Sequence, residues 1–288
     1  MTFGWGGGSL PDGFSPSVLA NQESSDCLIP MGITSENVAA DFGVSRERQD
    51  KFAAESFQKA AAAQKAGKFK DEIVPLKVKV INPETEKSVE VVVDADDGIR
   101  SGVTAESLSK LKPAFKKDGS THAGRPTLND CCSRDPIKCL LGNASQISDG
   151  AAAVVLARRS VAKRLGLPIV GKYVAAAVVG VPPRIMGVGP AYAIPKVLEK
   201  TGLSKDDVDF YEINEAFASQ AVYSVDKIGI SFGKVNVNGG AIAIGHPLGC
   251  STSLSSSLSR PELFYSICHI CSWSTANCYW FEHRQAEE

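Results

Sequence analysis

Residues 208–218 read VDFYEINEAFA and join a short apolar strand to the start of a helix. Val208 to Ile213 is the predicted strand, and the helix is expected to follow Asn214. The same order occurs upstream, where an apolar run from Ile169 to Val181 precedes a helix predicted from about Pro190 to Lys200. Strands and helices in alternation are typical of βαβ units, so the sequence predicts an α/β fold.

Further segments extend this pattern. Ala151 to Leu156 is an apolar run that predicts a buried strand, and a basic helix is expected around Arg158 to Arg164. Val235 to Val237 is also strand-like. These segments predict a sheet whose strands are connected by helices.

The N-terminal region predicts two helices. Thr34 is a candidate cap for a short helix that runs through Phe42 and ends at Gly43. Ser45 is a candidate cap for a longer helix that runs to about Gly67.

The longer helix is amphipathic, so one of its faces is predicted to pack into a core. That apolar face contains Phe52, Ala53, Phe57, Ala60 and Ala61. The polar side chains expected mostly off this face are Arg46, Glu47, Asp50, Glu55 and Lys59.

A β-hairpin is predicted after this helix. Val78 and Val80 alternate with lysines, and three valines at 89, 91 and 93 follow beyond Asn82-Pro83. Alternation of this kind predicts one buried face and one solvated face.

Composition excludes several classes of protein. The 288 residues include 31 Lys and Arg against 32 Asp and Glu, with a formal net charge of -1. No stretch approaches the run of about 20 apolar residues that a membrane span needs. No basic block suggests a nucleic acid or an anionic membrane surface as partner. The expected partner is therefore a small molecule or another protein.

The eight cysteines are expected to be free thiols, because the N-terminus has no signal-peptide pattern and nothing directs export. Six of them lie in two segments that break the pattern of strands and helices: 125–142, which shows neither helical nor strand periodicity, and 251–288, which opens with a serine-rich run. The second segment is expected to be disordered or poorly packed. A zinc site drawn from Cys268, His269, Cys271, Cys278 and His283 is an alternative, although the spacing fits no familiar zinc finger.

The residues with the clearest chemistry lie in GGAIAIGHPLG, residues 239–249. Its glycines allow the backbone to approach a ligand closely, and His246 is held before a proline as an aimed base would be. Asn214 lies where a strand ends and a helix begins, the edge at which α/β folds bind ligands. Its amide is suited to hold a water or to polarise an oxyanion. The alternatives are a helix cap for Asn214 and a core histidine for His246.

Four separated motifs resemble the thiolase family, most closely its peroxisomal 3-ketoacyl-CoA type. In chain order they are PMGITSENV at 30–38, NASQ at 143–146 followed by SDGAA at 148–152, NEAFA at 214–218, and GGA to GHP at 239–247. The resemblance covers residues 1–124 and 143–250, and it implies a layered α/β/α fold with a mostly helical loop domain.

The resemblance also implies roles for individual residues. His246 matches the histidine that deprotonates a nucleophilic cysteine and helps to bind the thioester oxygen. Asn214 matches the asparagine whose ordered water completes that oxyanion hole. The positions that resemble coenzyme A or substrate contacts are Ser145, Ala144, Ala123, Met31 and Phe217. For Ser145 the alternative is an ordinary turn serine, and for Met31 and Phe217 it is core packing.

The implied reaction is reversible acyl transfer in fatty-acid β-oxidation, with coenzyme A as substrate and no metal or redox cofactor. The implied complete fold is a homodimer that binds acyl-CoA, and not nucleic acid or a membrane. The implied location is the peroxisome, with mitochondrion and cytosol as alternatives.

The sequence departs from the family pattern at both catalytic cysteines. No run resembling Asn-Arg-Gln-Cys-Ser-Ser-Gly occurs, and none of the C-terminal cysteines precedes a Gly-x-Gly. We therefore expect the chain as written to lack turnover. The alternatives are a catalytically inactive remnant that binds coenzyme A or forms dimers, and the product of a mis-spliced gene model.

The expected organisation follows from the resemblance. Residues 1–120 are the loop domain, 121–165 the end of the N-terminal thiolase half, 166–250 an incomplete C-terminal half, and 251–288 a tail outside the family. Residues 125–142 are expected to be an insertion that separates Gly124 from Asn143, which are adjacent in the family motif.

Overall fold

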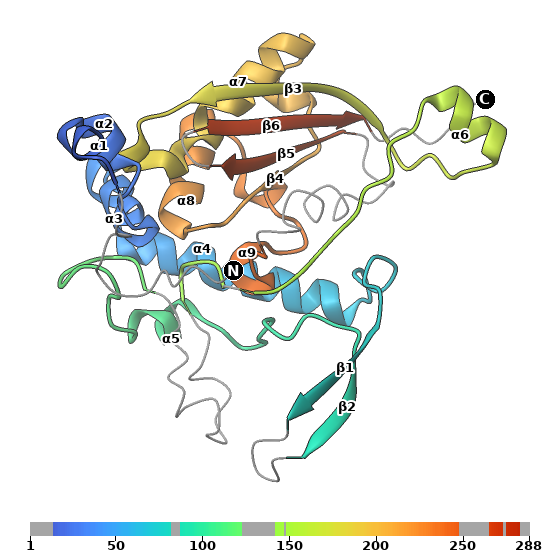
Figure 1. The fold of residues 1–288 in the computed structure, drawn as a ribbon, viewed down its shortest axis with the longest axis horizontal. Helices are drawn as coiled ribbons and strands as arrows, with labels where there is room; N and C mark the ends of the chain where they lie inside the picture. Colours follow the sequence, from blue (N-terminus) through green and yellow to red (C-terminus); the bar gives the residue numbers. More distant parts are fainter. Residues whose placement is uncertain are drawn as a thin grey trace.

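The computed structural model describes residues 14–81, 87–122, 142–146 and 148–247, together with the backbones of 265–272 and 275–282 (Figure 1). The expected insertion at 125–142 lies outside the described residues except for Gly142. The side chains of the candidate zinc ligands also lie outside the described part, so that site stays a prediction.

Helices make up most of the N-terminal region. They are α1 (Pro16–Ala20), α2 (Gln22–Asp26), α3 (Met31–Phe42), α4 (Arg46–Lys65) and α5 (Ala105–Ser109). The predicted cap of α4 is confirmed, because the Ser45 side chain accepts a hydrogen bond from the Arg48 N–H. The predicted start of α3 is wrong by one turn. The helix begins at Met31, and the Thr34 hydroxyl donates to the Met31 carbonyl oxygen inside it.

The apolar face of α4 lies in the main core. Phe52, Ala53, Phe57 and Ala60 are buried as predicted, whereas Ala61 is only half-buried. The expectation for Asp50 is wrong: it is 2% exposed. Its carboxylate is buried because partners from other segments, described below, surround it.

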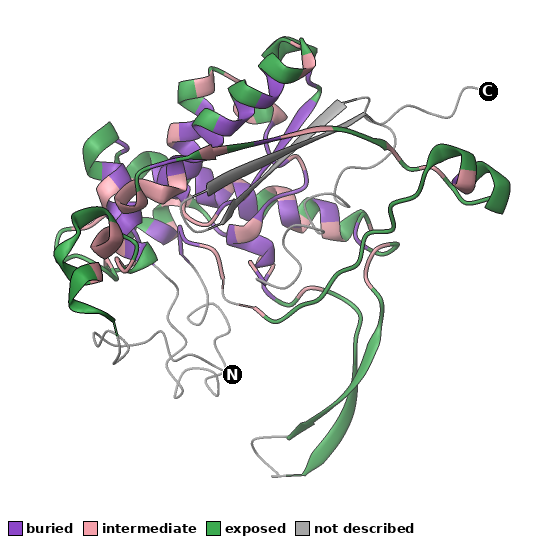
Figure 2. Cartoon of the chain, turned by 45° about the horizontal axis from the view of Figure 1, so that its top comes forward, coloured by how far each residue is buried: buried purple, intermediate pink, exposed green. Residues whose placement is uncertain are grey.

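The predicted hairpin forms from β1 (Leu76–Ile81) and β2 (Ser88–Val93), which pair antiparallel with Val78 opposite Val91. The predicted buried face is wrong, because every residue of both strands is exposed (Figure 2). The hairpin projects away from the helices, so no described element covers its valines.

The second half of the chain forms a mixed sheet and its covering helices. These elements are α6 (Arg159–Leu165), β3 (Lys172–Gly180), α7 (Pro190–Thr201), β4 (Phe210–Ile213), α8 (Ala218–Ile228), α9 (Ala241–Ile244), β5 (Tyr265–Ser272) and β6 (Thr275–Glu282), with 3-10 turns at Pro183–Val188, Lys205–Asp207 and Phe232–Lys234. The predicted α/β class is confirmed.

The sheet has the order β3-β6-β5-β4. Strands β3 and β5 both run antiparallel to β6, and β4 runs parallel to β5. Strands β3 and β4 are therefore parallel to each other and connected through α7, as a βαβ unit requires. The two strands between them come from the tail, so the expectation of a disordered tail is wrong for the backbones of 265–272 and 275–282.

Two predicted strands do not form. Residues 151–156 are exposed and adopt neither helix nor strand, because no described strand lies beside them to complete a ladder. Val235 makes only an isolated parallel bridge to Tyr211. By contrast, the predicted helices around 158–164 and 190–200 are confirmed as α6 and α7.

Two buried clusters hold the elements together. One joins α4, α8 and α9 through side chains such as Phe57, Val222 and Ile242. The other joins α7 to the sheet through side chains such as Ile194 and Tyr211. Because α8 contributes to both clusters, the loop before it is fixed from both sides.

Substitution of the glycine that ends α3 tests this account of the backbone. Gly43 has φ of 66°, and a Cβ added there would meet nothing within 4 Å. Gly43→Ala should therefore lower the free energy of unfolding by about 1 kcal/mol through backbone conformation alone. Urea unfolding measures this loss. Gly180→Ala is the matched control, because that glycine is equally open but lies in ordinary strand geometry. Equal effects of the two substitutions would contradict the explanation.

Candidate active site

The end of β4 positions Asn214. All four residues of this strand are buried, and the chain turns after Ile213 into the loop before α8. The side chain of Asn236 pairs with this strand end as a neighbouring strand would. Its Oδ1 accepts from the Ile213 N–H at 2.8 Å, and its Nδ2 donates to the Ile213 carbonyl oxygen at 2.8 Å. The main chain of Ile213, next to Asn214, is thereby fixed through both its N–H and its carbonyl oxygen.

A buried carboxylate connects this loop to the glycine-rich segment. Glu215 is 1% exposed and accepts hydrogen bonds from the Ser56 hydroxyl at 2.6 Å, Asn236 Nδ2 at 2.7 Å and the Ile242 N–H at 3.1 Å. A Cβ at Gly240 would lie 2.3 Å from this carboxyl group, so the close approach requires glycine there. Burial raises the pKa of Glu215, although the bonds from Ser56 and Asn236 act in the opposite direction.

The NASQ segment at 143–146 lies against the NEAFA loop. Ala144 bridges antiparallel to Phe217, the Ser145 N–H donates to the Ala216 carbonyl oxygen at 2.9 Å, and the Ala218 N–H donates to the Asn143 carbonyl oxygen at 2.8 Å. The segment thus pairs with the loop in front of α8 through an isolated bridge and two main-chain hydrogen bonds.

Gln146 joins the NASQ segment to the segment that contains His246. Its carbonyl oxygen accepts from the His246 N–H at 2.9 Å. Its side-chain Nε2 donates to the carbonyl oxygens of Ile242 at 3.0 Å and Ala243 at 3.1 Å, at the end of α9. Three motifs that are far apart in the sequence therefore meet at one place.

His246 and Asn214 face each other at this meeting point. The Asn214 Nδ2 lies 3.4 Å from the His246 Nε2. Burial lowers the pKa of the His246 imidazole, so the ring is neutral at neutral pH. A neutral imidazole can accept a proton, and an adjacent amide can donate to a developing oxyanion. The pair provides both functions within one hydrogen-bond length.

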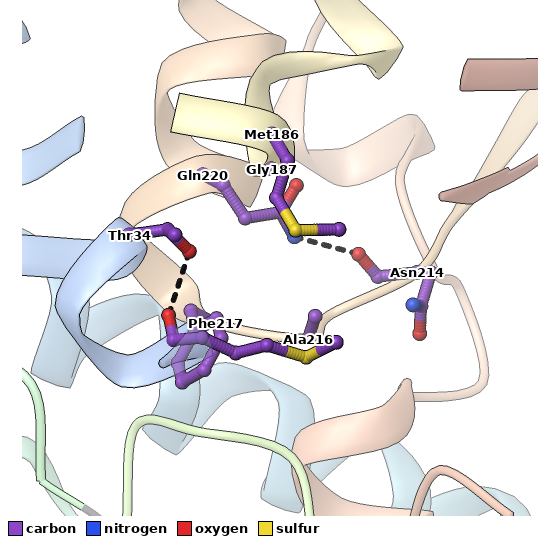
Figure 3. A pocket seen from close by; sticks show the side chains of 8 residues that line it. Thr34, Met186, Gly187, Asn214, Ala216, Phe217 and Gln220 are labelled. Carbon is purple, nitrogen blue, oxygen red and sulfur yellow. Dashed lines mark hydrogen bonds between the residues drawn. The ribbon is translucent and has the colours of Figure 1, made fainter. Parts of the chain in front are cut away.

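A small apolar cavity opens beside Asn214 (Figure 3). Its volume is about 30 Å³. The residues that line it are Met31, Thr34, Met186, Gly187, Asn214, Ala216, Phe217 and Gln220. Met31 begins α3 and Phe217 precedes α8, so the cavity lies between the helical region and the strand end.

The structure thus brings most of the predicted site residues together. Met31 and Phe217 line the cavity with Asn214, and His246 lies at Asn214. Ala144 and Ser145 pair with the same loop but are not among the cavity-lining residues. Ala123 lies outside the described residues. The binding roles given to these residues stay predictions.

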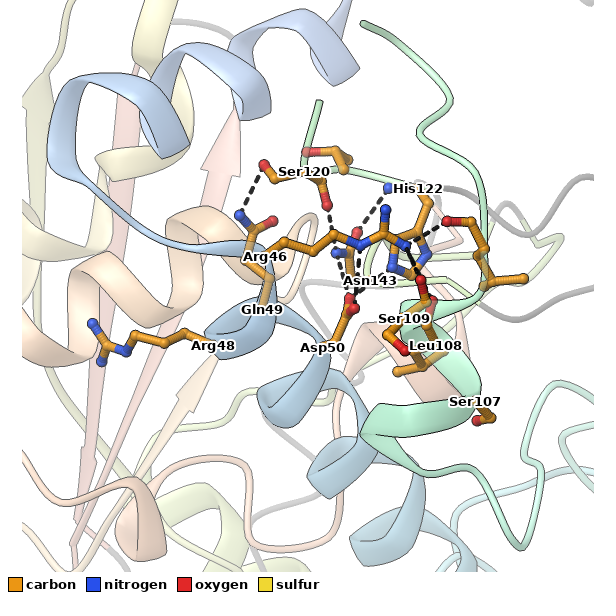
Figure 4. Close-up of polar contacts among 12 residues, drawn as sticks. Arg46, Arg48, Gln49, Asp50, Ser107, Leu108, Ser109, Ser120, His122 and Asn143 are labelled. Atoms are coloured by element: carbon orange, nitrogen blue, oxygen red, sulfur yellow. Dashed lines mark hydrogen bonds and ion pairs between the residues drawn. The ribbon is translucent and has the colours of Figure 1, made fainter. Parts of the chain in front are cut away.

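A second buried polar cluster surrounds Asn143, the first residue of the NASQ segment (Figure 4). The Asp50 Oδ1 lies 2.7 Å from the His122 Nε2 and accepts from the Asn143 Nδ2 at 3.0 Å. Arg46 pairs with the same carboxylate at 3.3 Å. The Asn143 Oδ1 in turn accepts from the His122 N–H at 2.9 Å. Asn143 is therefore held by Asp50 of α4 and by the main chain of His122.

Sequence reasoning missed several residues that build the site. Glu215 lies in the NEAFA motif, two residues after a buried strand. A charged side chain at that place was a usable signal. Asn236 and Asp50 gave no local signal, because their partners lie far away in the sequence. No group of three or more His, Cys, Asp or Glu side chains suited to a metal occurs among the described residues.

The sequence matches two family models, described as the thiolase N-terminal domain over residues 10–134 and the thiolase C-terminal domain over residues 167–275. It is 58% identical over 238 residues to a peroxisomal 3-ketoacyl-CoA thiolase of Yarrowia lipolytica, which covers 83% of this chain and 53% of the relative. It is 55% identical over 241 residues to the peroxisomal 3-ketoacyl-CoA thiolase B of Rattus norvegicus, covering 84% of this chain and 52% of that protein. The chain thus spans about half the length of the curated relatives it matches.

Solved structures show the same likeness. The dimeric peroxisomal thiolase of Saccharomyces cerevisiae matches with a TM-score of 0.80 and 48% identity, over 94% of this chain and 63% of that one. The human mitochondrial 3-ketoacyl-CoA thiolase matches with a TM-score of 0.76 and 35% identity, over 89% and 60%. The predicted thiolase-like fold is confirmed by these matches.

Glu212 on β4 gives the site strand a pH dependence that can be measured. It is 4% exposed, its Oε1 has no hydrogen-bond partner in the described part, and burial raises its pKa well above the ordinary value. The folded state therefore keeps the proton that the unfolded chain releases above about pH 4.3. Stability should be fully present below that pH and fall as the pH rises through the folded pKa.

Glu212→Gln should remove this loss. Urea unfolding at pH 5 and pH 8 should show the variant more stable than the wild type at pH 8, by about 1 kcal/mol or more, with a smaller difference at pH 5. Glu106→Gln is the control, because that side chain is exposed and its pKa is lowered by Lys110. A difference for Glu212→Gln that does not change with pH would refute the buried, protonated carboxyl.

Proposed function

Because this chain belongs to the thiolase family, we propose that it carries part of a site for acyl transfer to coenzyme A, the reaction that cleaves a 3-ketoacyl-CoA and releases acetyl-CoA. The observation that carries this proposal is the placement of the His246 Nε2 3.4 Å from the Asn214 Nδ2, beside an apolar cavity. The names of the relatives support the same substrate class.

In the proposed reaction a cysteine thiolate attacks the 3-keto carbonyl carbon. The bond between the second and third carbons breaks, its electrons go to the departing acetyl-CoA carbanion, and that carbanion takes up a proton. The acyl group is then transferred from the cysteine to the thiol of a second coenzyme A. His246 takes the proton of the attacking thiol, and Asn214 stabilises the oxyanion of the thioester. Loss of one such donor typically lowers the rate by about 10²–10³-fold.

The remaining site residues are proposed to bind the substrate. Ser145 and Ala144 lie in the NASQ segment, beside the loop that precedes α8, where the pantetheine arm is proposed to pass. Met31 and Phe217 form apolar walls of the cavity and are proposed to contact the acyl group. Ala123 is proposed as a further contact. Coenzyme A is a substrate in this scheme, and no further cofactor is proposed.

These 288 residues are proposed to bind without turning over. Neither family-like cysteine motif occurs in them. The one cysteine whose side chain the structure describes, Cys27, is exposed, and its thiol donates to the Glu23 carbonyl oxygen of its own helix. A chain of this length that binds coenzyme A and forms dimers without catalysis is the second candidate function, favoured by the same observation.

Assembly and location follow the relatives. A homodimer is proposed because the matched yeast structure is described as dimeric. A peroxisomal location is proposed because the curated relatives are named as peroxisomal. Nucleic acid and membranes are not proposed as partners. Among the described residues, no helix combines the length and apolar character of a membrane span.

Titration of the purified chain with coenzyme A, followed by an acetoacetyl-CoA cleavage assay, tests the proposal. We expect saturable binding and no cleavage above background. Ser145→Tyr should weaken binding at least about tenfold, because a bulky ring on the NASQ segment blocks the proposed path of the pantetheine arm. Ser109→Tyr, at an exposed serine on α5, should bind as the wild type does. Measurable turnover would refute the predicted inactivity, and absence of binding would refute the coenzyme A site.

A further inference from the structure

Gln220 is a buried amide in the wall of the apolar cavity. It lies in the first turn of α8, is 2% exposed, and lines the cavity together with Asn214 (Figure 3). A polar side chain at such a site needs hydrogen-bond partners to offset its lost hydration. The partners that it has, and the one that it lacks, indicate its role.

The donor end of this amide is used on Asn214. The Gln220 Nε2 donates to the Asn214 main-chain carbonyl oxygen at 2.7 Å. This bond fixes the peptide group between Asn214 and Glu215. The Asn236 bonds fix the main chain before Asn214, at Ile213. The Asn214 amide is consequently held in its position facing His246.

The acceptor end faces no described partner. The Gln220 Oε1 is buried and has no hydrogen-bond partner in the described part of the chain. Glutamines with only a packing role normally have both ends satisfied, since a buried unpaired oxygen costs about 1–3 kcal/mol. The side chain therefore keeps an unfavourable environment at the cavity wall while it holds Asn214.

The backbone that carries the Gln220 side chain is itself fixed. The Gln220 main-chain carbonyl oxygen accepts from the Ser224 hydroxyl at 2.7 Å, one turn further along α8. The helix packs between the two core clusters. A preorganised donor of this kind requires no rearrangement when charge develops on a bound thioester.

We propose that Gln220 is a positioning residue, which holds the Asn214 peptide so that the Asn214 side chain meets the carbonyl oxygen of a coenzyme A thioester. This inference rests on the proposed function. It predicts selective recognition of thioesters, because free coenzyme A has the same pantetheine arm but no thioester carbonyl.

The experiment compares the affinities of acetyl-CoA and free coenzyme A for the full 288-residue chain. Gln220→Met keeps the length and volume of the side chain but removes its hydrogen bond. The affinity for acetyl-CoA should fall about tenfold, and that for coenzyme A should stay within about twofold. Val225→Ala is the matched control on the same helix, because it creates a cavity in the core behind α8 without touching the site. Both affinities should be unchanged in this variant.

A second variant covers a folding failure. Gln220→Asn keeps a buried amide but is one methylene too short to reach the Asn214 carbonyl oxygen, so it should show the same selective loss. Equal losses for both ligands, or no loss for either, in the variant that folds would overturn the proposal.

A spectroscopic measurement separates this inference from the proposed function. The chain has four histidines, so the ring nitrogen signals of His246 can be assigned in an NMR spectrum by substitution. Release of Asn214 should shift the His246 Nε2 signal in Gln220→Met and leave it in place in Val225→Ala. If the wild type bound neither ligand, the proposed function would fail while this shift still tested the positioning role. Absence of the shift would overturn that role.

Discussion

The buried carboxylate of Glu215 is the interaction on which the site depends. It accepts hydrogen bonds from the Ser56 hydroxyl of α4, from the Asn236 side chain, and from the Ile242 N–H in α9. A carboxylate without these donors would be very costly at 1% exposure. Because the donors come from three separate segments, the carboxylate holds α4, the end of β4 and the glycine-rich segment in one arrangement.

The placement of the Asn214 and His246 side chains follows from this arrangement. Asn214 directly precedes Glu215, so its backbone is fixed by the same contacts. His246 lies shortly after α9, whose first turn donates to Glu215 and whose last residues accept from Gln146. The NASQ segment is bonded to the buried Asp50 carboxylate through Asn143. Its Gln146 carbonyl oxygen accepts from the His246 N–H. The supporting structure thus holds the two side chains 3.4 Å apart, where the Asn214 Nδ2 and the His246 Nε2 are within hydrogen-bond distance.

Local signals in the sequence predicted the elements that depend on local physics. The Ser45 cap, the end of α3 at Gly43, and the apolar face of α4 all follow from caps and helical spacing. Elements that depend on distant partners were predicted less well. Residues 151–156 have strand composition but no described neighbour, and the hairpin valines alternate as a buried face would but remain exposed.

The site shows the same division. Asn214 and His246 are candidates on the sequence because their motifs combine strand ends, glycines and a proline with chemically suited side chains, and the roles that the resemblance gives them stay predictions. Asp50 was expected on the polar side of its helix, since nothing near it indicates that His122 and Asn143 surround its carboxylate. Asn236 was invisible for a related reason. Its role is to replace a strand, and this depends on where β4 ends in space.

The strand order β3-β6-β5-β4 determines when the sheet can assemble in a cell. A ribosome completes β3 and β4 well before it makes the two strands that separate them, because β4 ends at Ile213 and β5 begins at Tyr265. Until then, β3 and β4 have unpaired edges that are prone to pair with other chains. Nascent molecules of this protein therefore expose these edges from the synthesis of Ile213 until β5 and β6 have emerged, and this is the interval in which they are most prone to pair with other chains.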